Sequence, residues 1–337
     1  MIDLKSLNEE DLSSVVGSLG LPSYREKQLI HWIYERGVTD VRDITELPVP
    51  LRERLSRIAY ISSLKVIERQ VSGDGTEKFL FGLEDGETIE TVLIPDGGRR
   101  TLCISSQVGC TMGCRFCLTA RIGFVRNLTA HEIADQVITV RRLIKPEELT
   151  GIVLMGMGEP LNNLDGVADA LWRITGHLRI SKRRITLSTA GVVPVINRLP
   201  GVIPSVNLAV SLNATTNAVR DMLMPVNRRY QIEELLSACR NYPLDRRRRI
   251  TFEYILIEGL NDNPEDAERL VIMLRGIPSK VNLIPFNPFE GAEFRPSPDE
   301  KILAFQEILI RRGMTALIRK SKGRDILAAC GQLKGHR

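Results

Sequence analysis

Strands and helices alternate along most of the chain, and this alternation restricts the fold more than any other feature. From about residue 101 onward, short apolar runs typical of strands are separated by stretches with helical spacing of apolar residues. The expected strands are 101–108, 151–155, 184–189, 206–212, 248–257 and 280–285, with 314–319 as an edge strand, and the expected helices are 129–144, 165–177, 232–240 and 264–274. Repeated strand–helix units predict an α/β fold whose parallel sheet is closed or partly closed as a barrel. Chemistry is then expected at the carboxyl ends of the strands.

The first 95 residues follow a different pattern. Apolar residues recur at helical spacing in three short segments, and from residue 65 their period changes to two, interrupted by turn residues at 72–75 and 84–86. This pattern predicts a small helical module joined to a β-meander. We expect an accessory domain over 1–95, a core domain over 96–322 and a C-terminal tail over 323–337, with the Asp96-Gly97-Gly98 turn at the first boundary.

Composition excludes several classes of protein. Hydrophobic residues make up 43% of the chain and charged residues 26%, as in ordinary globular proteins, and six cysteines are too few for a disulfide scaffold of this length. The polar, acidic start predicts no secretory signal, and no apolar run approaches the roughly 20 residues of a membrane span. We therefore expect a cytoplasmic protein without membrane contact, in which thiols stay reduced.

Three of the six cysteines are crowded into one short segment. Cys110, Cys114 and Cys117 form a Cys-x₃-Cys-x₂-Cys motif directly after the first strand of the expected barrel. Three thiolates on one loop suit an iron–sulfur cluster, which normally takes four cysteine ligands, so one iron would stay open to the amino and carboxylate groups of a methionine-like molecule. The alternatives are a zinc site with His131 as fourth ligand, and a trio of buried thiols without a metal.

The aromatic residue before the last of these cysteines completes a motif that resembles the radical S-adenosylmethionine (SAM) superfamily. Further segments resemble the RlmN/Cfr family within it. They are Ser106-Gln107-Val108-Gly109-Cys110, Gly123-Phe124-Val125-Arg126-Asn127-Leu128-Thr129, Met155-Gly156-Met157-Gly158-Glu159-Pro160, Asn287-Pro288-Phe289, Asp74-Gly75-Thr76 and Ala328-Ala329-Cys330-Gly331-Gln332-Leu333. The resemblance runs from about residue 65 to residue 333. The N-terminal helices agree more loosely, and they resemble an accessory RNA-binding module.

The resemblance implies a partial (β/α)6 radical-SAM barrel and two cofactors, a four-iron, four-sulfur (4Fe-4S) cluster and SAM. Cys110, Cys114 and Cys117 would hold the cluster, whose open iron binds SAM for reductive cleavage to a 5′-deoxyadenosyl radical. The implied SAM contacts are Gly158, Glu159, Ser188, Ser211, Leu212, Asn213 and Asn287. A carboxylate such as Glu159 can accept a hydrogen bond from the SAM ammonium group. On its own, the glycine-rich segment that carries Glu159 would be an ordinary turn between a strand and a helix.

Two further cysteines receive roles from the resemblance. Cys330 would carry a methyl group taken from one SAM molecule, and the radical made from a second SAM would join this carbon to the RNA base. Cys103 would then attack the sulfur of Cys330, forming a disulfide and releasing the product, while Glu90 accepts a proton. Without the resemblance, Cys330 is a tail thiol, Cys103 a buried strand residue or a fourth cluster ligand, and Glu90 a surface group. Cys239 matches no motif and is predicted to serve packing.

Positive charge is concentrated in four clusters, although the formal net charge is only +5. The clusters are 182–184, 246–249, 311–312 and 319–324. Any one of them could be a solvated face, but four clusters around a barrel whose family modifies RNA favour contact with phosphates. The last cluster is close in sequence to Cys330 and could bring RNA to the methyl carrier.

The resemblance therefore implies an RNA methyltransferase that places a methyl group on C2 of an adenine in 23S ribosomal RNA of the large subunit. An adenine beside the tRNA anticodon is a second expected substrate, and a reductase or flavodoxin-type protein is the expected electron donor. Two alternatives stay open. The first is methylation at C8, which confers resistance to ribosome-targeting antibiotics, and the second is a non-catalytic zinc-binding protein that interacts with RNA.

Overall fold

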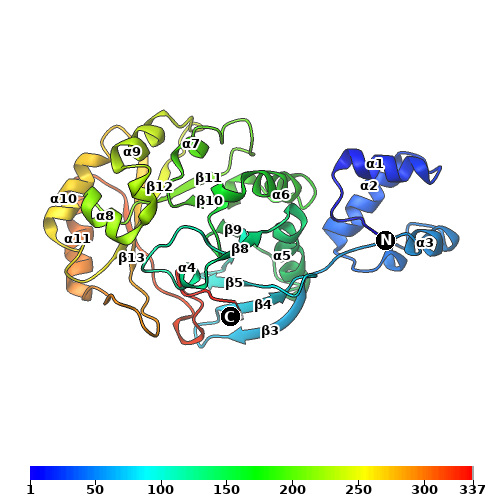
Figure 1. Cartoon of the computed structure of the whole chain (residues 1–337), viewed down its shortest axis with the longest axis horizontal. Coiled ribbons are helices and arrows are strands. Elements are labelled where there is room, and N and C mark those ends of the chain that lie inside the picture. The colour runs from blue at the N-terminus through cyan, green and yellow to red at the C-terminus, as the bar shows by residue number, and fades with distance from the viewer. Residues whose placement is uncertain (336–337) are drawn as a thin grey trace.

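A single ten-stranded sheet runs through most of the molecule (Figure 1). The structure is a computed structural model that describes residues 1–335. Seven consecutive strands of the sheet are parallel: β6 (Arg99–Cys103), β9 (Gly151–Leu154), β10 (Ile185–Thr189), β11 (Asn207–Ser211), β12 (Ile250–Leu256), β13 (Ser279–Pro285) and β14 (Ala316–Ile318). The predicted partial (β/α)6 barrel is therefore confirmed, with β14 as an additional edge strand.

Helices cover the outside of this barrel, as Figure 1 shows. The main ones are α5 (Ala130–Leu143), α6 (Leu164–Gly176), α9 (Ile232–Asn241), α10 (Pro264–Met273) and α11 (Asp299–Arg311), and shorter ones are α4 (Leu118–Ile122), α7 (Val193–Ile196) and α8 (Asn217–Leu223). α5 begins at a capping box in which Thr129 and Glu132 each accept the other's backbone N–H. The sequence analysis missed α11, although Ile302, Phe305 and Leu309 lie buried at helical spacing.

The first predicted strand, 101–108, is wrong in its extent. β6 ends at Cys103, and β7 (Gln107–Gly109) pairs with β8 (Phe124–Asn127) in a separate two-stranded sheet. The break occurs at Ser105, whose backbone N–H and C=O are bonded to the side-chain amide of Gln136 rather than to a neighbouring strand. Buried polar side chains thus replace the ladder bonds, which an apolar sequence pattern does not reveal.

The predicted β-meander is present as β3 (Lys65–Val71), β4 (Glu77–Gly82) and β5 (Thr88–Asp96), which pair in antiparallel fashion. β5 also pairs with β6, so the meander extends the barrel sheet without interruption. The division into domains 1–95, 96–322 and 323–337 stays a prediction, and residues 336–337 of the expected tail lie outside the described residues.

The N-terminal module contains β1 (Ile2–Asp3), α1 (Glu9–Ser18), α2 (Tyr24–Ile30), a π-helical turn (His31–Arg36), α3 (Val49–Ser56) and β2 (Ala59–Tyr60). It lies beside α5 and α6 (Figure 1). Two buried cations connect it to the barrel. Lys5, which is 1% exposed, lies 2.6 Å from Asp135 of α5, and Arg173 of α6 donates to the backbone oxygens of Lys5 and Leu7. No helix among residues 1–335 is long and apolar enough to cross a membrane.

The Lys5–Asp135 pair generates a prediction about the attachment of the N-terminal module. Asp135 also accepts the backbone N–H of Leu64. Asp135→Ala therefore leaves this buried N–H without its acceptor and the ammonium group of Lys5 without its counter-charge, while the carbonyl of Ser62 still accepts from it. We expect the free energy of unfolding in urea to fall by about 3–5 kcal/mol. The double variant Lys5→Met/Asp135→Asn removes both charges, keeps an acceptor for Leu64, and should recover most of this loss. A decrease below about 1 kcal/mol for Asp135→Ala would show that this ion pair does not attach the N-terminal module to the barrel.

Candidate active site

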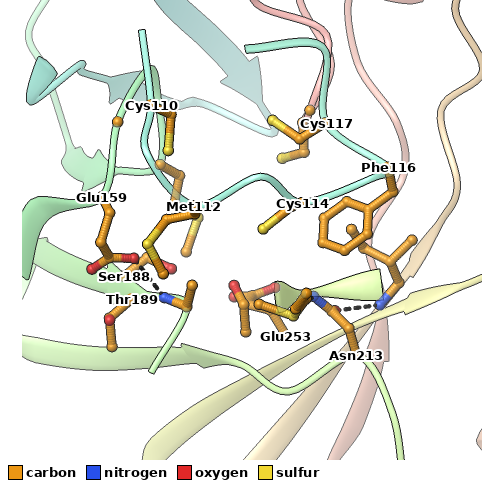
Figure 2. A pocket seen from close by; sticks show the side chains of 18 of the residues that line it. Cys110, Met112, Cys114, Phe116, Cys117, Glu159, Ser188, Thr189, Asn213 and Glu253 are labelled. Atoms are coloured by element: carbon orange, nitrogen blue, oxygen red, sulfur yellow. Dashed lines mark hydrogen bonds between the residues drawn. The ribbon is translucent and has the colours of Figure 1, made fainter. Parts of the chain in front are cut away.

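A cavity of about 150 Å³ opens at the carboxyl ends of β9 to β12. Figure 2 shows this cavity from close by. Nine of the residues predicted from the sequence line it: Cys110, Cys114, Cys117, Gly158, Glu159, Ser188, Ser211, Asn213 and Cys330. These residues come from five separate segments of the chain, so the barrel places them together where the sequence analysis expected chemistry.

The cysteine loop is fixed by close backbone contacts. Gly109 has a φ of +76°, and a Cβ atom at this position would lie 1.8 Å from the carbonyl oxygen of Gly123. The N–H of Cys110 donates to the same oxygen at 2.9 Å, and the N–H of Arg115 donates to Leu223 of α8 at 3.0 Å. In Figure 2 the sulfur atoms of Cys110, Cys114 and Cys117 are directed toward one common space.

Burial makes thiolates unfavourable in this loop. It raises the pKa of Cys110 to about 12 and raises the pKa values of Cys114 and Cys117, because the thiolate form loses its hydration. Each of these pKa values is raised further by another cysteine of the loop or by the nearby Cys330. Three thiolates can therefore coexist here only beside a strong positive charge, such as that of iron.

Two carboxylates face the cavity below the cysteine loop (Figure 2). Glu159 accepts hydrogen bonds from the N–H groups of Leu161 and Ala190, at 3.0 and 2.7 Å. Glu253 of β12 is 4% exposed, and its Oε1 accepts from Asn282 while its Oε2 has no hydrogen-bond partner among the described residues. Burial raises the pKa values of both carboxyls. The cavity thus offers buried negative charge to a cationic ligand.

The glycines before Glu159 bring two backbone segments together. Gly158 has a φ of +100°, and a Cβ atom there would lie 2.6 Å from the Cβ of Gln107. The N–H of Ser106 donates to Met157, and the side chain of Gln107 accepts the N–H of Glu159 at 2.9 Å. This packing places Glu159 in the lining of the cavity, together with Ser188 and Ser211.

The residues present fit a 4Fe-4S cluster and SAM. Three thiols converge on one side of the cavity, and a positively charged ligand would add a partner to the Oε2 of Glu253, which has no hydrogen bond from residues 1–335 and lies 3.9 Å from the guanidinium group of Arg319. Two predicted SAM contacts, Leu212 and Asn287, do not line this cavity. Leu212 is fully buried, and the side-chain oxygen of Asn213, which does line the cavity, accepts the N–H of Ile255.

A second cavity, of about 100 Å³, adjoins the first and is lined by Cys103, Cys117, Asn287, Arg319 and Cys330. Met155, Gly156 and Ile284 line both cavities, as do Cys117 and Cys330. Burial raises the pKa of Cys103 to about 12, the neighbouring Cys330 raises it further, and Arg319 opposes the shift. In turn, Cys330, Glu253 and Cys103 all raise the pKa of Arg319, which is therefore the cation that serves both thiols.

The C-terminal tail holds Cys330 in place through contacts with two distant segments, the β3–β4 turn and α4. Asp74 in the β3–β4 turn accepts the N–H of Gly323 at 3.0 Å, and Asp325 accepts the hydroxyl of Ser72 at 2.6 Å. Further along, the carbonyl of Gly331 accepts the N–H of Leu118, and that of Leu333 accepts the hydroxyl of Thr119, both at 2.6 Å.

Asn287 belongs to these tail contacts. Its side-chain amide donates to the carbonyl of Cys330 at 3.3 Å and accepts from Arg324 at 3.2 Å. It lines the second cavity but not the first. The Asn-Pro-Phe motif, the Asp-Gly-Thr motif and the Cys330 motif, which are far apart in sequence, therefore meet around the tail.

Glu90 of β5 is buried, unlike most glutamates on strands. Its carboxylate lies 3.1 Å from the ammonium group of Lys78 and accepts the backbone N–H of Lys334 at 2.7 Å. It lines neither cavity, and it is connected to the site through the tail residue Lys334.

The structure separates other candidates from the site. His131 lies 3.7 Å from Asp3 and lines a different cavity with Asp135, so it is not brought to the cysteines as a zinc ligand. Within residues 1–335 no three His, Cys, Asp or Glu side chains could hold a single metal ion. All six cysteines are free thiols, so Cys103 and Cys330 are not joined in a disulfide here, and Cys239 is packed in the core as predicted.

Sequence reasoning missed three charged residues around the cavities. They are Arg319 and Glu253, described above, and Arg220 of α8. Arg220 is fully buried and donates to the carbonyls of Ala190, Ser211 and Leu212. Burial lowers the pKa of Arg220 to about 10. The only signal for Glu253 was a carboxylate within an apolar strand, and Arg319 was assigned to a basic cluster.

Two family models match the chain. The model of the radical SAM superfamily matches residues 104–271, which contain the cysteine loop and most of the barrel. The model of the ribosomal RNA large subunit methyltransferase N-terminal domain matches residues 2–61. The second match corresponds to the helical module beside α5 and α6.

Similar proteins extend over nearly the whole chain. It is 52% identical to the dual-specificity RNA methyltransferase RlmN of Pelobacter propionicus, over 99% of this chain and 96% of that protein. It is 50% identical to the protein of the same name from Geobacter sulfurreducens, over 99% and 92%. A crystal structure of a radical SAM methyltransferase from Sphaerobacter thermophilus is 43% identical and has a TM-score of 0.93, with 99% of both chains covered.

The contacts of Asp74 generate a prediction about the tail. Asp74→Ala removes the acceptor for Gly323, so we expect faster amide exchange over 323–330, by about five- to tenfold for one lost hydrogen bond. Hydrogen–deuterium exchange with peptide-level mass spectrometry measures this. Asp85→Ala is the matched control, because Asp85 lies in the next hairpin turn and bonds to Glu87 and Arg126 instead. Equal exchange of the tail in both variants would refute the role of Asp74.

The pH dependence of this contact has a defined sign. Burial would raise the pKa of Asp74, but hydrogen bonds from Thr76, Gly323 and Ser72 outweigh it and lower the pKa to about 2. A carboxyl with a lowered pKa in the folded state stabilises that state above its unfolded pKa of about 4. Protection of the tail should therefore be complete near neutral pH and decrease as the pH falls from about 4 toward 2.

Proposed function

The chain belongs to the RlmN family of radical SAM RNA methyltransferases, and from this premise we propose that it methylates C2 of an adenine in the 23S RNA of the large ribosomal subunit. One observation carries the proposal. The cavity lined by the cysteine loop and the cavity lined by Cys103 share Cys330, so a methyl carrier would have both its donor and its resolving thiol within reach.

The target carbon explains why a carrier cysteine is useful. C2 of adenine lies between two ring nitrogens and has no lone pair with which to attack the methyl group of a sulfonium ion. When bound, the cluster and SAM supply the radical chemistry and the methyl group that this carbon requires. Cys110, Cys114 and Cys117 would hold the cluster. Gly158, Glu159, Ser188, Ser211, Leu212, Asn213 and Asn287 are the proposed SAM contacts.

Cys330 and Cys103 have complementary parts in this proposal. The thiolate of Cys330 takes up a methyl group as a thioether and presents its carbon to the adenine. After the carbon is bonded to C2, the thiolate of Cys103 attacks the sulfur of Cys330. A sulfur–sulfur bond forms, the carbon–sulfur bond breaks, and its electron pair leaves with the carbon, which takes up a proton. The guanidinium group of Arg319 would stabilise the thiolates that these steps require.

Glu90 is the proposed acceptor of the proton from C2. Its burial and its ion pair with Lys78 keep a carboxylate close to the tail, although it lies outside both cavities. Because it accepts the N–H of Lys334, four residues after the carrier, a movement of the tail would release one of its oxygens. Glu90 would therefore become available as a base when the tail, and Cys330 with it, changes position.

The same proposal includes a second substrate, an electron donor and a cellular location, all of which the sequence led us to expect. An adenine beside the tRNA anticodon is a second substrate, in line with the dual-specificity name of the relatives. A reductase or flavodoxin-type protein supplies electrons, and the reaction takes place in the cytoplasm. Methylation at C8 and a non-catalytic zinc-binding protein are not favoured, because relatives that are 50–52% identical over 99% of the chain carry the RlmN name.

Removing Cys103, the thiol proposed to release the product from Cys330, tests this function. Cys103→Ala should stop the reaction after the carbon has bonded to the base, because no thiol can attack Cys330. We expect an RNA–protein conjugate that survives denaturing electrophoresis, and a loss of released methylated RNA of at least about a hundredfold. The readout uses protein loaded with its cluster under anaerobic conditions, together with transcribed RNA.

Two variants serve as controls for this trap. Cys330→Ala should give neither conjugate nor product, since the carrier is absent. Cys239→Ala removes another buried thiol, outside the site, and should release product like the unchanged protein. Free product at an ordinary rate from Cys103→Ala would refute the resolving role, and product from Cys330→Ala would refute the carrier role.

A further inference from the structure

Two of the four basic clusters lie at the opposite end of the barrel from the active site. Residues 182–184 immediately precede β10, and residues 246–249 precede β12, so both lie at the amino ends of parallel strands. The two cavities open at the carboxyl ends. The seven residues of β12 alone span roughly 20 Å. These clusters are therefore too far from the cavities to contact the target nucleotide.

The two clusters form one continuous surface, which we call the basic rim and define as Lys182, Arg183, Arg184, Arg246, Arg247 and Arg248. The loop before β11 joins them. Ser205 in this loop donates to Asp245 at 2.8 Å, and its carbonyl accepts from Arg248 at 2.7 Å. The charges of Arg248, Lys182 and Arg183 all contribute to lowering the pKa of Asp245, after its hydrogen bond from Ser205.

Most of this positive charge is not neutralised by the protein. Arg248 is paired with Asp245 at 3.3 Å. Among residues 1–335, no carboxylate lies within ion-pair distance of the other five members of the rim, all of which are exposed. A surface of this kind attracts polyanions, and the attraction weakens with salt.

An open groove of about 720 Å³ adjoins the rim, between the end of α6 and the loop before β11. Trp172 lines it and is 54% exposed, although its indole N–H is fixed by the carbonyl of Val202 at 3.1 Å. Lys182 and Arg179 line the same groove, together with the hydroxyl groups of Thr175, Ser181 and Ser205. Arg179 also pairs with Glu35 of the N-terminal module at 3.0 Å, so the groove reaches that module.

We propose that the basic rim and the Trp172 groove form a second RNA-binding surface, separate from the active site. The rim contacts backbone phosphates, and the exposed indole face stacks on an unpaired base. An exposed tryptophan held rigidly beside a lysine and an arginine suits a nucleobase next to phosphates better than an acidic protein segment, which would need only the charges. The inference rests on the proposed function for the identity of the polyanion.

The position of this surface has a consequence for the substrate. A single short stem-loop that fills the active site cannot also reach the amino ends of the strands, whereas a multi-helix RNA domain can fold around the barrel. The rim should therefore increase affinity for large RNA substrates only. Specificity for the target adenine remains a property of the two cavities.

The test compares two RNA substrates and matched charge changes in the full-length protein. The first variant is Arg183→Glu/Arg246→Glu, and its control is Lys65→Glu/Lys145→Glu, which reverses two exposed charges outside all four basic clusters. Binding of a transcribed multi-helix fragment of large-subunit RNA and of its target stem-loop is measured over a series of salt concentrations. We expect the rim variant to bind the large fragment at least about tenfold more weakly than the control does. The salt slope should decrease by about 2.

The stem-loop arm separates this proposal from the proposed function. The rim variant should bind and methylate the stem-loop like the unchanged protein. If the unchanged protein fails to methylate the stem-loop, the result counts against the proposed function. If the stem-loop is methylated normally, and the rim variant and the control bind the large fragment equally well, only the second RNA-binding surface is overturned. A rim variant that loses affinity for an acidic peptide such as polyglutamate but not for the large RNA would also overturn it.

The groove is tested separately through its aromatic ring. Trp172→Ala should weaken binding of the large fragment about fivefold or more, with an unchanged salt slope, because stacking does not release counterions. Trp172→Phe keeps an aromatic face and should retain most of the affinity. Equal loss in both variants, or a loss for the stem-loop as well, would contradict the stacking role.

Discussion

The loss of hydration on burying thiols is the constraint on which the architecture of this site depends. Cys103, Cys110, Cys114 and Cys117 all have raised pKa values because they are buried, yet ligation and nucleophilic attack both require thiolates. Positive charge must therefore come from elsewhere. Iron would supply it to the cysteine loop, and Arg319 supplies it in the second cavity. Burial also raises the pKa values of Glu159 and Glu253 and so disfavours their carboxylate forms, which a bound cationic ligand would stabilise.

The tail adds the thiol of Cys330 to the two cavities of the barrel. It crosses from the β3–β4 turn to α4, and hydrogen bonds to Asp74, Asn287, Leu118 and Thr119 hold it there. The described part of the tail has one 3₁₀ turn, Arg324–Ile326, and buries Ala328 and Leu333. Hydrogen bonds of this kind are individually weak and can open separately. The meander extends the barrel sheet without entering the barrel, and its β3–β4 turn provides one of the contacts that hold the tail.

The sequence predicted the barrel because apolar strands and amphipathic helices alternate regularly, and it predicted the cysteine loop because spacing within eight residues is a local property. It could not predict how Asp74 meets Gly323, since nothing local connects residues so far apart. It also missed the end of β6, where Gln136 replaces the ladder bonds of Ser105. The location of the basic rim, in contrast, was implicit in the sequence, because both clusters lie at the amino ends of predicted strands.

The central claim is that these thiols deliver a methyl group to one carbon of an adenine. Mass spectrometry of nucleosides tests it most directly, using large-subunit RNA transcribed without modifications and incubated with the cluster-loaded protein, SAM and a reductant. The account predicts 2-methyladenosine at one position, and none when Cys330→Ala replaces the unchanged protein. Methylation at C8, methylation of another base, or 2-methyladenosine formed by the Cys330→Ala variant would contradict it.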